Sequence, residues 1–430
     1  KSYLKAKNEE AYSHVFITHY PDEERPAARP LRTAPCYERM KNLGAVFGQK
    51  FGWERPNFFA TDGMEQKDDW SFRRSKWFDA IKKECQNVKE NVGLLDMTAF
   101  AKCRIKGPSA EAFLDKLVAN KLPKKVGRIN LCHALNTKGG VHSEFTIMRE
   151  SETSFYLVSA GAYQRLDHDW ILRWMPDDGS VQFENLTNSN GVLVVAGPKA
   201  RELMCRVSKD DFSNDNFKWL SSKMVDVGHA PVNAMRVNFV GELGWEIYIS
   251  SDMAAHVFEE IMQRSKEMPI KLCGLHSLDS CRIEKAYRHY GHDISSEDNI
   301  IEAGLGFAVK TQKSKGKFGD FIGKNSVEIK KQEGVEKRLM QFVLNDSDPL
   351  LFHNEPIIKN DKIVGYLTSG NFGHHLGAAV GMGYVECNER GESPENQLKG
   401  NYMIDVAGKR HQATPFLKPA YDPSNGNIKI

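Results

Sequence analysis

Two carboxylates stand in sequence surroundings that suit recognition of a flat, nitrogen-rich ring. Glu144 follows a Gly-Gly turn in a predicted strand, where alternation places it on the face opposite to Phe145. Glu246 stands in the second arm of a predicted hairpin over 236–248, and Phe239 stands in the first arm. A carboxylate accepts two N–H bonds from an amino-pyrimidine edge, and an aromatic side chain stacks on the ring. The pattern is therefore compatible with a planar heterocyclic ligand.

The same residues also have a purely structural interpretation. A carboxylate on a strand is usually a solvated edge charge, and an aromatic hairpin often belongs to a core. A third polar stretch is a predicted helix that Gly291 closes as a C-cap, in which ordinary ion pairs involve Arg282, Lys285, Asp279 and Glu284. From the residues alone, both interpretations stay open.

Several common kinds of site are missing from the sequence. No GxGxxG follows a predicted strand, and there is no GxxxxGK[ST], GxSxG or HExxH. The 8 cysteines are scattered without a CxxC pair or zinc-type spacing, so we expect unpaired thiols and no metal site. With 59 basic and 56 acidic residues, the chain lacks the basic excess of a nucleic-acid scaffold.

Sequence features also bear on location. No stretch approaches the roughly 20 apolar residues of a membrane-spanning helix, and the start at Lys1 carries no apolar signal segment. The chain does not begin with Met, so we expect that residues were removed or that it is part of something longer. We expect a cytoplasmic protein, or a mitochondrial matrix protein in a eukaryote, without a nucleic-acid or membrane partner.

Residues 1–70 form a segment unlike the rest of the chain. Its frequent prolines forbid long helices except around 36–47, while its aromatic residues must still bury surface. We expect a docking strap with little regular structure that packs against another domain. The residues behind this expectation are Pro21, Pro26, Pro30, Pro35, Pro56, Tyr12, Phe16, Tyr20, Phe47, Phe51, Trp53, Phe58 and Phe59.

The middle of the chain, 71–330, alternates predicted strands and helices and contains an internal echo. Strand 101–107 and strand 191–197 are each followed by Gly-Pro and a helix, with Pro108 and Pro198 in the first helical turn. Such punctuation is common, but two units about 90 residues apart favour a pseudo-duplicated α+β core.

Residues 331–430 contain short predicted strands separated by Asp, Asn and Gly turns. This spacing is typical of a small antiparallel barrel or sandwich. The predicted strands are 339–344, 357–358, 363–368, 378–385 and 402–406.

Taken together, these stretches resemble the aminomethyltransferase (glycine-cleavage T-protein) family over essentially the whole chain. The resemblance is greater to the C-terminal half of dimethylglycine and sarcosine dehydrogenases, where a segment like 52–59 (GWERPNFF) joins a flavin half to a folate half. The other matching motifs, in their usual order, are Val126-Gly127-Arg128, GGVHSEF, GELGWEIY, RIEKAYRHYGHDI, EAGLGF and Phe321-Ile322-Gly323-Lys324.

The resemblance implies an α+β fold of three domains around a central hole that holds tetrahydrofolate, with a C-terminal antiparallel β-barrel. It places Glu144 beside the reactive nitrogens of the folate as the catalytic residue. It also implies folate contacts from Phe145 and Thr146, from Glu246, Ile247 and Tyr248 at the pterin edge, and from the aromatic residues Phe239 and Phe307.

The function implied is a one-carbon transfer unit that captures the iminium methylene of an oxidised N-methyl amine as 5,10-methylenetetrahydrofolate. FAD would reside only on a flavin half that this chain lacks, so the implied partner is a flavin-dependent oxidoreductase domain or subunit that oxidises the small N-methyl amine. Leu278 replaces an arginine of T-proteins, which puts glycine-cleavage activity in doubt. The alternatives are a standalone folate-dependent aminomethyltransferase or demethylase and a non-catalytic folate-binding factor.

Overall fold

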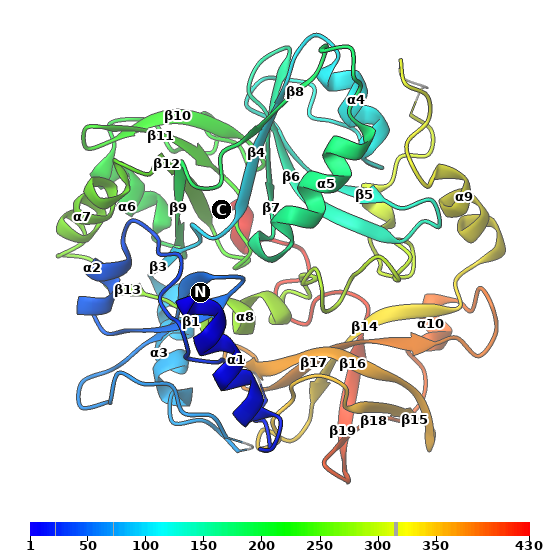
Figure 1. Ribbon diagram of the computed structural model, residues 1–430. Helices are drawn as coiled ribbons and strands as arrows, with labels where there is room; N and C mark the ends of the chain where they lie inside the picture. The colour runs from blue at the N-terminus through cyan, green and yellow to red at the C-terminus, as the bar shows by residue number, and fades with distance from the viewer. Residues whose placement is uncertain (22, 72, 314–316) are drawn as a thin grey trace.

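A computed structural model describes residues 1–21, 23–71, 73–313 and 317–430 of the 430-residue chain. The described residues form an N-terminal segment, two β-sheets with helices beside them, and a C-terminal barrel (Figure 1). The helices are α1 (Ser2–His14), α2 (Tyr37–Asn42), α3 (Phe78–Glu90), α4 (Ala110–Leu117), α5 (Gln164–Trp174), α6 (Ala200–Val207), α7 (Ala254–Arg264), α8 (Leu275–Glu284), α9 (Lys324–Glu333) and α10 (Pro394–Gln397), with short 3₁₀ turns η1 (Gly161–Tyr163), η2 (Gly306–Ala308) and η3 (Asn427–Lys429).

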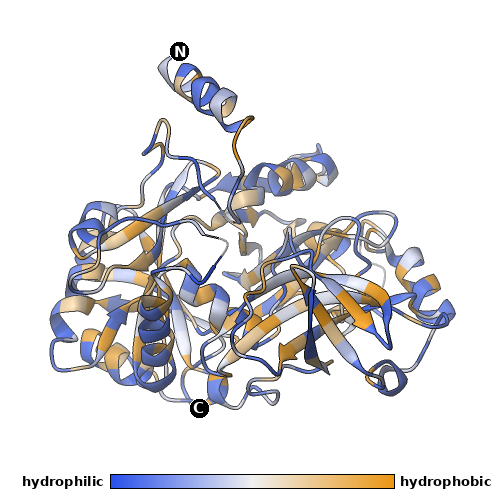
Figure 2. Ribbon diagram, turned by 90° about the horizontal axis from the view of Figure 1, so that it is seen from below, coloured by the Kyte–Doolittle hydropathy of each residue, from blue (hydrophilic) through white to orange (hydrophobic). Residues whose placement is uncertain are grey.

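The N-terminal segment has more regular structure than its prolines suggest, which corrects the sequence-based expectation. Helix α1 ends before the first proline, and a hairpin of β1 (Ala45–Lys50) and β2 (Trp53–Phe59) follows α2. The aromatic residues divide by position. Phe58 is fully buried against the core, whereas Tyr12 and Phe16 near the end of α1 are each 73% exposed. Helix α1 projects from the body of the molecule (Figure 2).

Two sheets form the middle of the molecule. One has the strand order β5-β6-β7-β4-β8, and the other has the order β10-β11-β12-β9-β3-β13. Neighbouring strands are antiparallel except for the parallel pair β13 and β3. The strands are β3 (Val92–Asp96), β4 (Ala101–Lys106), β5 (Ile129–Leu135), β6 (Val141–Arg149), β7 (Ser154–Ser159), β8 (Gln182–Asn185), β9 (Asn190–Ala196), β10 (Ser222–Val227), β11 (Ala230–Met235), β12 (Gly244–Ser250) and β13 (Ile270–Leu272).

The internal echo in the sequence is confirmed as a structural duplication. Strand β4 followed by α4 occupies the same place in one sheet that β9 followed by α6 occupies in the other, after three consecutive strands. Gly107 and Gly197, which link strand to helix, both have positive φ, at 128° and 137°. A Cβ on either glycine would collide with the carbonyl oxygen of Ser180 or Asn91, so both turns require glycine.

The two sheets face each other across a buried layer to which strands of both contribute. This inner layer contains Ile129, Met148 and Tyr156 from one sheet and Val192 and Tyr248 from the other. The outer faces are covered by helices, α4 and α5 on the five-stranded sheet and α6 and α7 on the six-stranded sheet. Because side chains alternate along a strand, each strand residue can be assigned to the inner or the outer face.

The C-terminal residues form a closed antiparallel barrel, which decides between the predicted barrel and sandwich. Its order is β14-β17-β16-β15-β18-β19, and the five predicted strands are all present. The sequence did not predict a sixth strand, β19. The strands are β14 (Lys337–Leu344), β15 (Pro356–Lys359), β16 (Lys362–Gly373), β17 (Ala378–Glu386), β18 (Tyr402–Val406) and β19 (Lys409–Phe416).

Helix α8 connects the sheets to the barrel, and it is shorter than predicted. It ends at Glu284, and Gly291 lies in a turn beyond it rather than at its C-cap. The expected ion pair within the helix is also wrong for Lys285, whose Nζ lies 3.0 Å from Oδ2 of Asp422. The irregular segment 285–293 therefore leaves the helix and runs beside the sheets.

Candidate functional site

Glu144 lies on β6, where it is paired with a buried histidine. The register of β5 and β6 places His133 directly opposite Glu144, so the two side chains lie on the same face. Nε2 of His133 lies 2.9 Å from Oε2 of Glu144. The His133 side chain is fully buried and that of Glu144 is 25% exposed. One carboxylate oxygen is thus engaged by the protein.

Alternation along β6 places Glu144 on the inner face. Met148, on the same side of the strand, belongs to the layer between the sheets, and Thr146 lies between them. Phe145 points the other way, into the outer core beneath α4 and α5. Its side chain therefore cannot reach the inner face, and Phe145 can contribute there only through its backbone.

Glu246 lies on the inner face of the other sheet. It is 6% exposed, and among the described residues its hydrogen-bonding partner is Tyr248, whose hydroxyl donates to Oε2 at 2.7 Å. Burial raises the pKa of Glu246 to about 7, and the bond from Tyr248 opposes that shift. The intervening Ile247 is buried in the outer core beneath α6 and α7. Alternation along β12 thus places Glu246 on the inner face and its neighbour Ile247 in the outer core.

Phe239 lies in the loop between β11 and β12, not in a hairpin arm as the sequence predicted. Its ring centroid is 5.7 Å from that of Tyr287, with an interplanar angle of 30°. Both side chains are half-buried, and Phe239 packs against the core cluster that contains Val194 of β9. Two aromatic rings therefore lie together beside the inner face that carries Glu246.

The segment after α8 links the two carboxylate regions. Tyr287 contacts Phe239, while the next residue, Arg288, interacts electrostatically with Glu144. Burial lowers the pKa of Arg288, and the negative charges of Asp293 and Glu144 oppose this shift. Sequence reasoning gave no role to Tyr287, Arg288 or His133. Regular counting back from the Gly-Gly turn would have placed Cys132 opposite Glu144, because the β5–β6 register shifts by one residue between Ala134 and Leu135.

Phe307 lies in η2, which packs against β5, the strand that carries His133. Its side chain is 65% exposed. The backbone carbonyl of Ala303 accepts a hydrogen bond from Nε of Arg288 at 3.1 Å, which ties the stretch before η2 to the segment after α8. Of the predicted aromatic residues, Phe239 is thus half-buried beside Tyr287 and Phe307 is exposed near β5.

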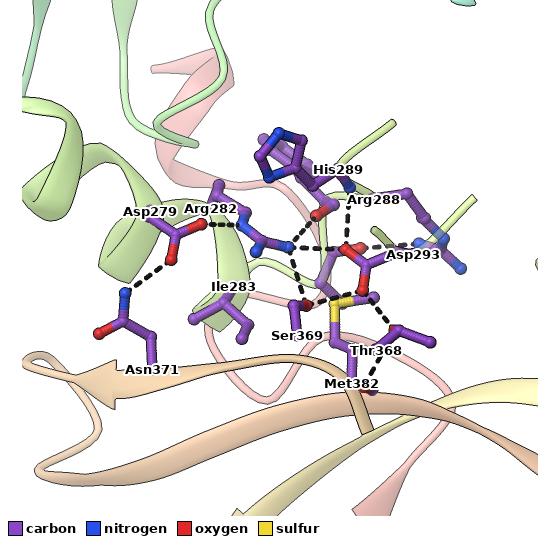
Figure 3. A network of polar contacts seen from close by, with 12 residues as sticks. Asp279, Arg282, Ile283, Arg288, His289, Asp293, Thr368, Ser369, Asn371 and Met382 are labelled. Atoms are coloured by element: carbon purple, nitrogen blue, oxygen red, sulfur yellow. Dashed lines mark hydrogen bonds and ion pairs between the residues drawn. The ribbon is translucent and has the colours of Figure 1, made fainter. Parts of the chain in front are cut away.

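A buried polar network anchors this segment to the barrel (Figure 3). Arg282 of α8 lies 2.6 Å from Asp279 and 2.7 Å from Asp293. Asp293 also accepts hydrogen bonds from the hydroxyls of Thr368 and Ser369 on β16. The network fixes both ends of the stretch 285–293, which holds the side chains of that stretch in place.

Within the described ranges, no group of three or more His, Cys, Asp or Glu side chains could hold a metal ion. The helices described here include none that is long and apolar enough to cross a membrane. The inner-face groups can do three things chemically. The carboxyls accept hydrogen bonds or protons, the aromatic pair can stack, and Arg288 supplies a positive charge.

Two family models match the chain in an order that follows its architecture. The GCVT N-terminal domain matches residues 36–313, and the glycine cleavage T-protein C-terminal barrel domain matches residues 337–422. The chain belongs to the glycine-cleavage T-protein family. Residues 1–34 match a different family, the FAD dependent oxidoreductase central domain. The T-protein match therefore begins at residue 36, about half-way through the N-terminal segment.

Individual relatives agree with this assignment. The chain is 35% identical to human mitochondrial dimethylglycine dehydrogenase over 93% of its length and 46% of that protein. It is 32% identical to the mouse mitochondrial pyruvate dehydrogenase phosphatase regulatory subunit, over 97% of this chain and 50% of that protein. The chain thus spans about half the length of these relatives.

A solved T-protein shares the fold. The glycine cleavage system aminomethyltransferase T from Bartonella henselae superposes with a TM-score of 0.76 at 21% identity, covering 91% of this chain and 99% of that one. The expected three-part T-protein fold with its C-terminal barrel is therefore confirmed.

Proposed function

We propose that this chain is the tetrahydrofolate-binding, one-carbon transfer unit of an N-methyl amine dehydrogenase. It captures the methylene group of an oxidised dimethylglycine- or sarcosine-like amine as 5,10-methylenetetrahydrofolate. The observation that carries the proposal is the buried carboxyl of Glu246, which accepts a hydrogen bond from Tyr248 and lies on the face beside the Phe239–Tyr287 ring pair. Membership of the T-protein family supports it.

The residues present fit a folate. A pterin ring has an amino-pyrimidine edge that donates two N–H bonds, and Glu246 has an oxygen left to accept one beside the oxygen that Tyr248 engages. Phe239 and Phe307 supply aromatic surface. Thr146 lies on the same inner face as Glu144.

Glu144 is the proposed catalytic residue. Tetrahydrofolate, when bound, supplies the two amine nitrogens between which the methylene carbon is captured, with release of the demethylated amine and one proton. Because His133 engages Oε2, the other oxygen of Glu144 is available to take up that proton. General base catalysis of this kind typically contributes about 10²–10⁴ in rate.

The proposed partner is a flavin-dependent oxidoreductase domain or subunit that carries FAD. The match of residues 1–34 to the FAD dependent oxidoreductase central domain supports this partner. So does the aromatic surface near the end of α1, where Tyr12 and Phe16 are largely exposed. We place the unit in the cytoplasm, or in the mitochondrial matrix of a eukaryote, as the mitochondrial relatives suggest.

A second candidate is a regulatory, non-catalytic folate-binding unit. The similarity to the pyruvate dehydrogenase phosphatase regulatory subunit favours this alternative. The two functions differ in one measurable respect. A regulatory unit would bind tetrahydrofolate without directing any methylene group to it.

The test is the product partition of the Glu144→Gln variant. In the protein that carries this chain together with its flavin partner, oxidation of dimethylglycine or sarcosine is followed with tetrahydrofolate present. We expect the variant to bind tetrahydrofolate normally but to release formaldehyde where the wild type forms 5,10-methylenetetrahydrofolate. Equal partition in both proteins would remove Glu144 from the mechanism. Formaldehyde alone from the wild type would favour the regulatory alternative.

A further inference from the structure

A buried histidine lies behind the proposed catalytic carboxylate. His133 is fully buried, and its Nε2 lies 2.9 Å from Oε2 of Glu144. The other ring nitrogen, Nδ1, is also buried and has no hydrogen-bond partner among the described residues. Within the part of the chain that the structure describes, the one polar contact of the ring is therefore with Glu144.

This asymmetry determines which nitrogen carries the proton. A proton on Nδ1 alone would leave a buried N–H without an acceptor and would turn the Nε2 lone pair toward a carboxylate oxygen. A proton on Nε2 forms a hydrogen bond to Glu144 and leaves only a lone pair unpaired. We therefore assign the neutral Nε2–H tautomer, in which His133 donates and Glu144 accepts.

We propose that His133 is a positioning residue that holds Glu144 as a carboxylate with Oε2 engaged and Oε1 directed to the ligand. The inference rests on the proposed function, because it concerns the group that takes up the proton. Glu246 offers a parallel across the inner layer, since Tyr248 donates to one of its oxygens at 2.7 Å. In both sheets a buried donor engages one oxygen and leaves the other.

Other ionisable groups also act on Glu144. Arg288 and Tyr290 belong to the segment after α8, and Asp167 belongs to α5; all three interact electrostatically with Glu144. Arg288 donates to the backbone carbonyls of Ala286 and Ala303 rather than to the carboxylate. Among the described residues, His133 is therefore the side chain that forms a hydrogen bond with Glu144.

The experiment compares His133→Phe, which removes the donor, with His133→Gln, which keeps an N–H donor of similar reach. A donor to a charged group is worth enough that its loss should slow methylene transfer roughly tenfold to a hundredfold. Without the donor the carboxylate is protonated more easily, so the acidic limb of the pH profile should move to higher pH. The His133→Gln variant should keep most of the wild-type rate and the wild-type position of the acidic limb.

A matched control and a second readout separate positioning from folding. His411→Phe removes a histidine near Asp346 in the barrel, at 3.3 Å, and should leave rate and pH profile unchanged. Independently of activity, ¹⁵N NMR of the wild type should show the Nε2–H tautomer for His133, with its signal absent from His133→Phe. This measurement stands even where the phenylalanine variant folds poorly.

Two results would overturn the inference alone: an Nδ1–H tautomer, or an unchanged pH profile in a folded His133→Phe protein that still binds tetrahydrofolate. If the wild type does not bind tetrahydrofolate, or if Glu144→Gln shows normal product partition, the proposed function is overturned, and this inference with it. The two failures are therefore distinguishable.

Discussion

The two carboxyl groups on the inner faces, Glu144 and Glu246, differ in burial and in their hydrogen-bond partners. Glu246 is almost fully buried, and its raised pKa keeps it largely protonated until the pH approaches 7. Glu144 is a quarter exposed and bonded to His133. A ligand edge that donates N–H bonds favours the ionised form of Glu246. Such a ligand would therefore lower the pKa that burial raises in the free protein.

The raised pKa of Glu246 predicts a pH-dependent effect of Glu246→Gln on stability. A folded-state pKa of about 7, above the ordinary 4.5, contributes stability below pH 4.5 that is lost as the pH rises through 7. Glu246→Gln has no ionisable group at this position, so its stability does not fall in this way as the pH rises. Its free energy of unfolding relative to wild type should therefore rise between pH 5 and pH 8, by at most about 3 kcal/mol.

Urea unfolding of both proteins at pH 5 and pH 8 measures this difference. The exposed Glu297 provides the control, because Glu297→Gln should change stability equally at both pH values. Parallel pH dependence of wild type and Glu246→Gln would show that the buried carboxyl does not titrate as described.

At the scale of residues, the sequence indicated acidic and aromatic candidates but not the side chains that contact them. Alternation correctly separated Glu144 from Phe145, and the same rule places Ile247 in the outer core. Tyr287 and Arg288 were not predicted, because their positions depend on the barrel that holds the segment after α8. No local pattern records that contact between distant parts of the chain.

At the scale of elements, the polar network of α8 joins the sheets to the barrel. Arg282 is 2% exposed and Asp293 is fully buried, so neither charge has water to replace a lost partner. We expect Asp293→Asn to lower the free energy of unfolding by about 3 kcal/mol or more, because it leaves the buried guanidinium short of a countercharge.

Chemical denaturation followed by circular dichroism measures this change. The exposed pair of Arg165 and Asp169 on α5, at 2.8 Å, is a matched control in which Asp169→Asn should change the free energy of unfolding far less, because water screens both charges. Equal effects of the two substitutions would mean that the buried network contributes no more than a surface pair.

Elements with strong local chemistry were predicted well. The two Gly-Pro turns predicted the duplication, because each needs a positive φ that glycine allows. The predicted place of the prolines was wrong: Pro108 and Pro198 each lie one residue before the N-cap of the helix rather than in its first turn. Strand β19 was missed because its sequence is polar and only His411 and Ala413 are buried. Helix α8 was overextended because residues after Glu284 suit a helix, whereas Ala286 has a φ of 50°.

At the scale of the whole molecule, the proposed site depends on two sheets that face each other. Glu144 and Glu246 are about a hundred residues apart in the sequence and belong to different halves of the duplication. Each half supplies one carboxyl to the inner side. Both residues were candidates from the sequence, but only the packing of the sheets accounts for their common orientation.

The central claim is that Glu246 binds the pterin edge of tetrahydrofolate. Isothermal titration calorimetry of this chain with tetrahydrofolate tests it most directly, with Glu246→Ala beside Glu84→Gln. Glu84 of α3 is a matched control, because it is another buried carboxyl whose pKa is raised to about 7. It accepts hydrogen bonds from the backbone N–H groups of Phe59 and Gly274. The account predicts binding by wild type and control, and affinity at least about tenfold weaker for Glu246→Ala. Full-strength binding by a folded Glu246→Ala protein would contradict it.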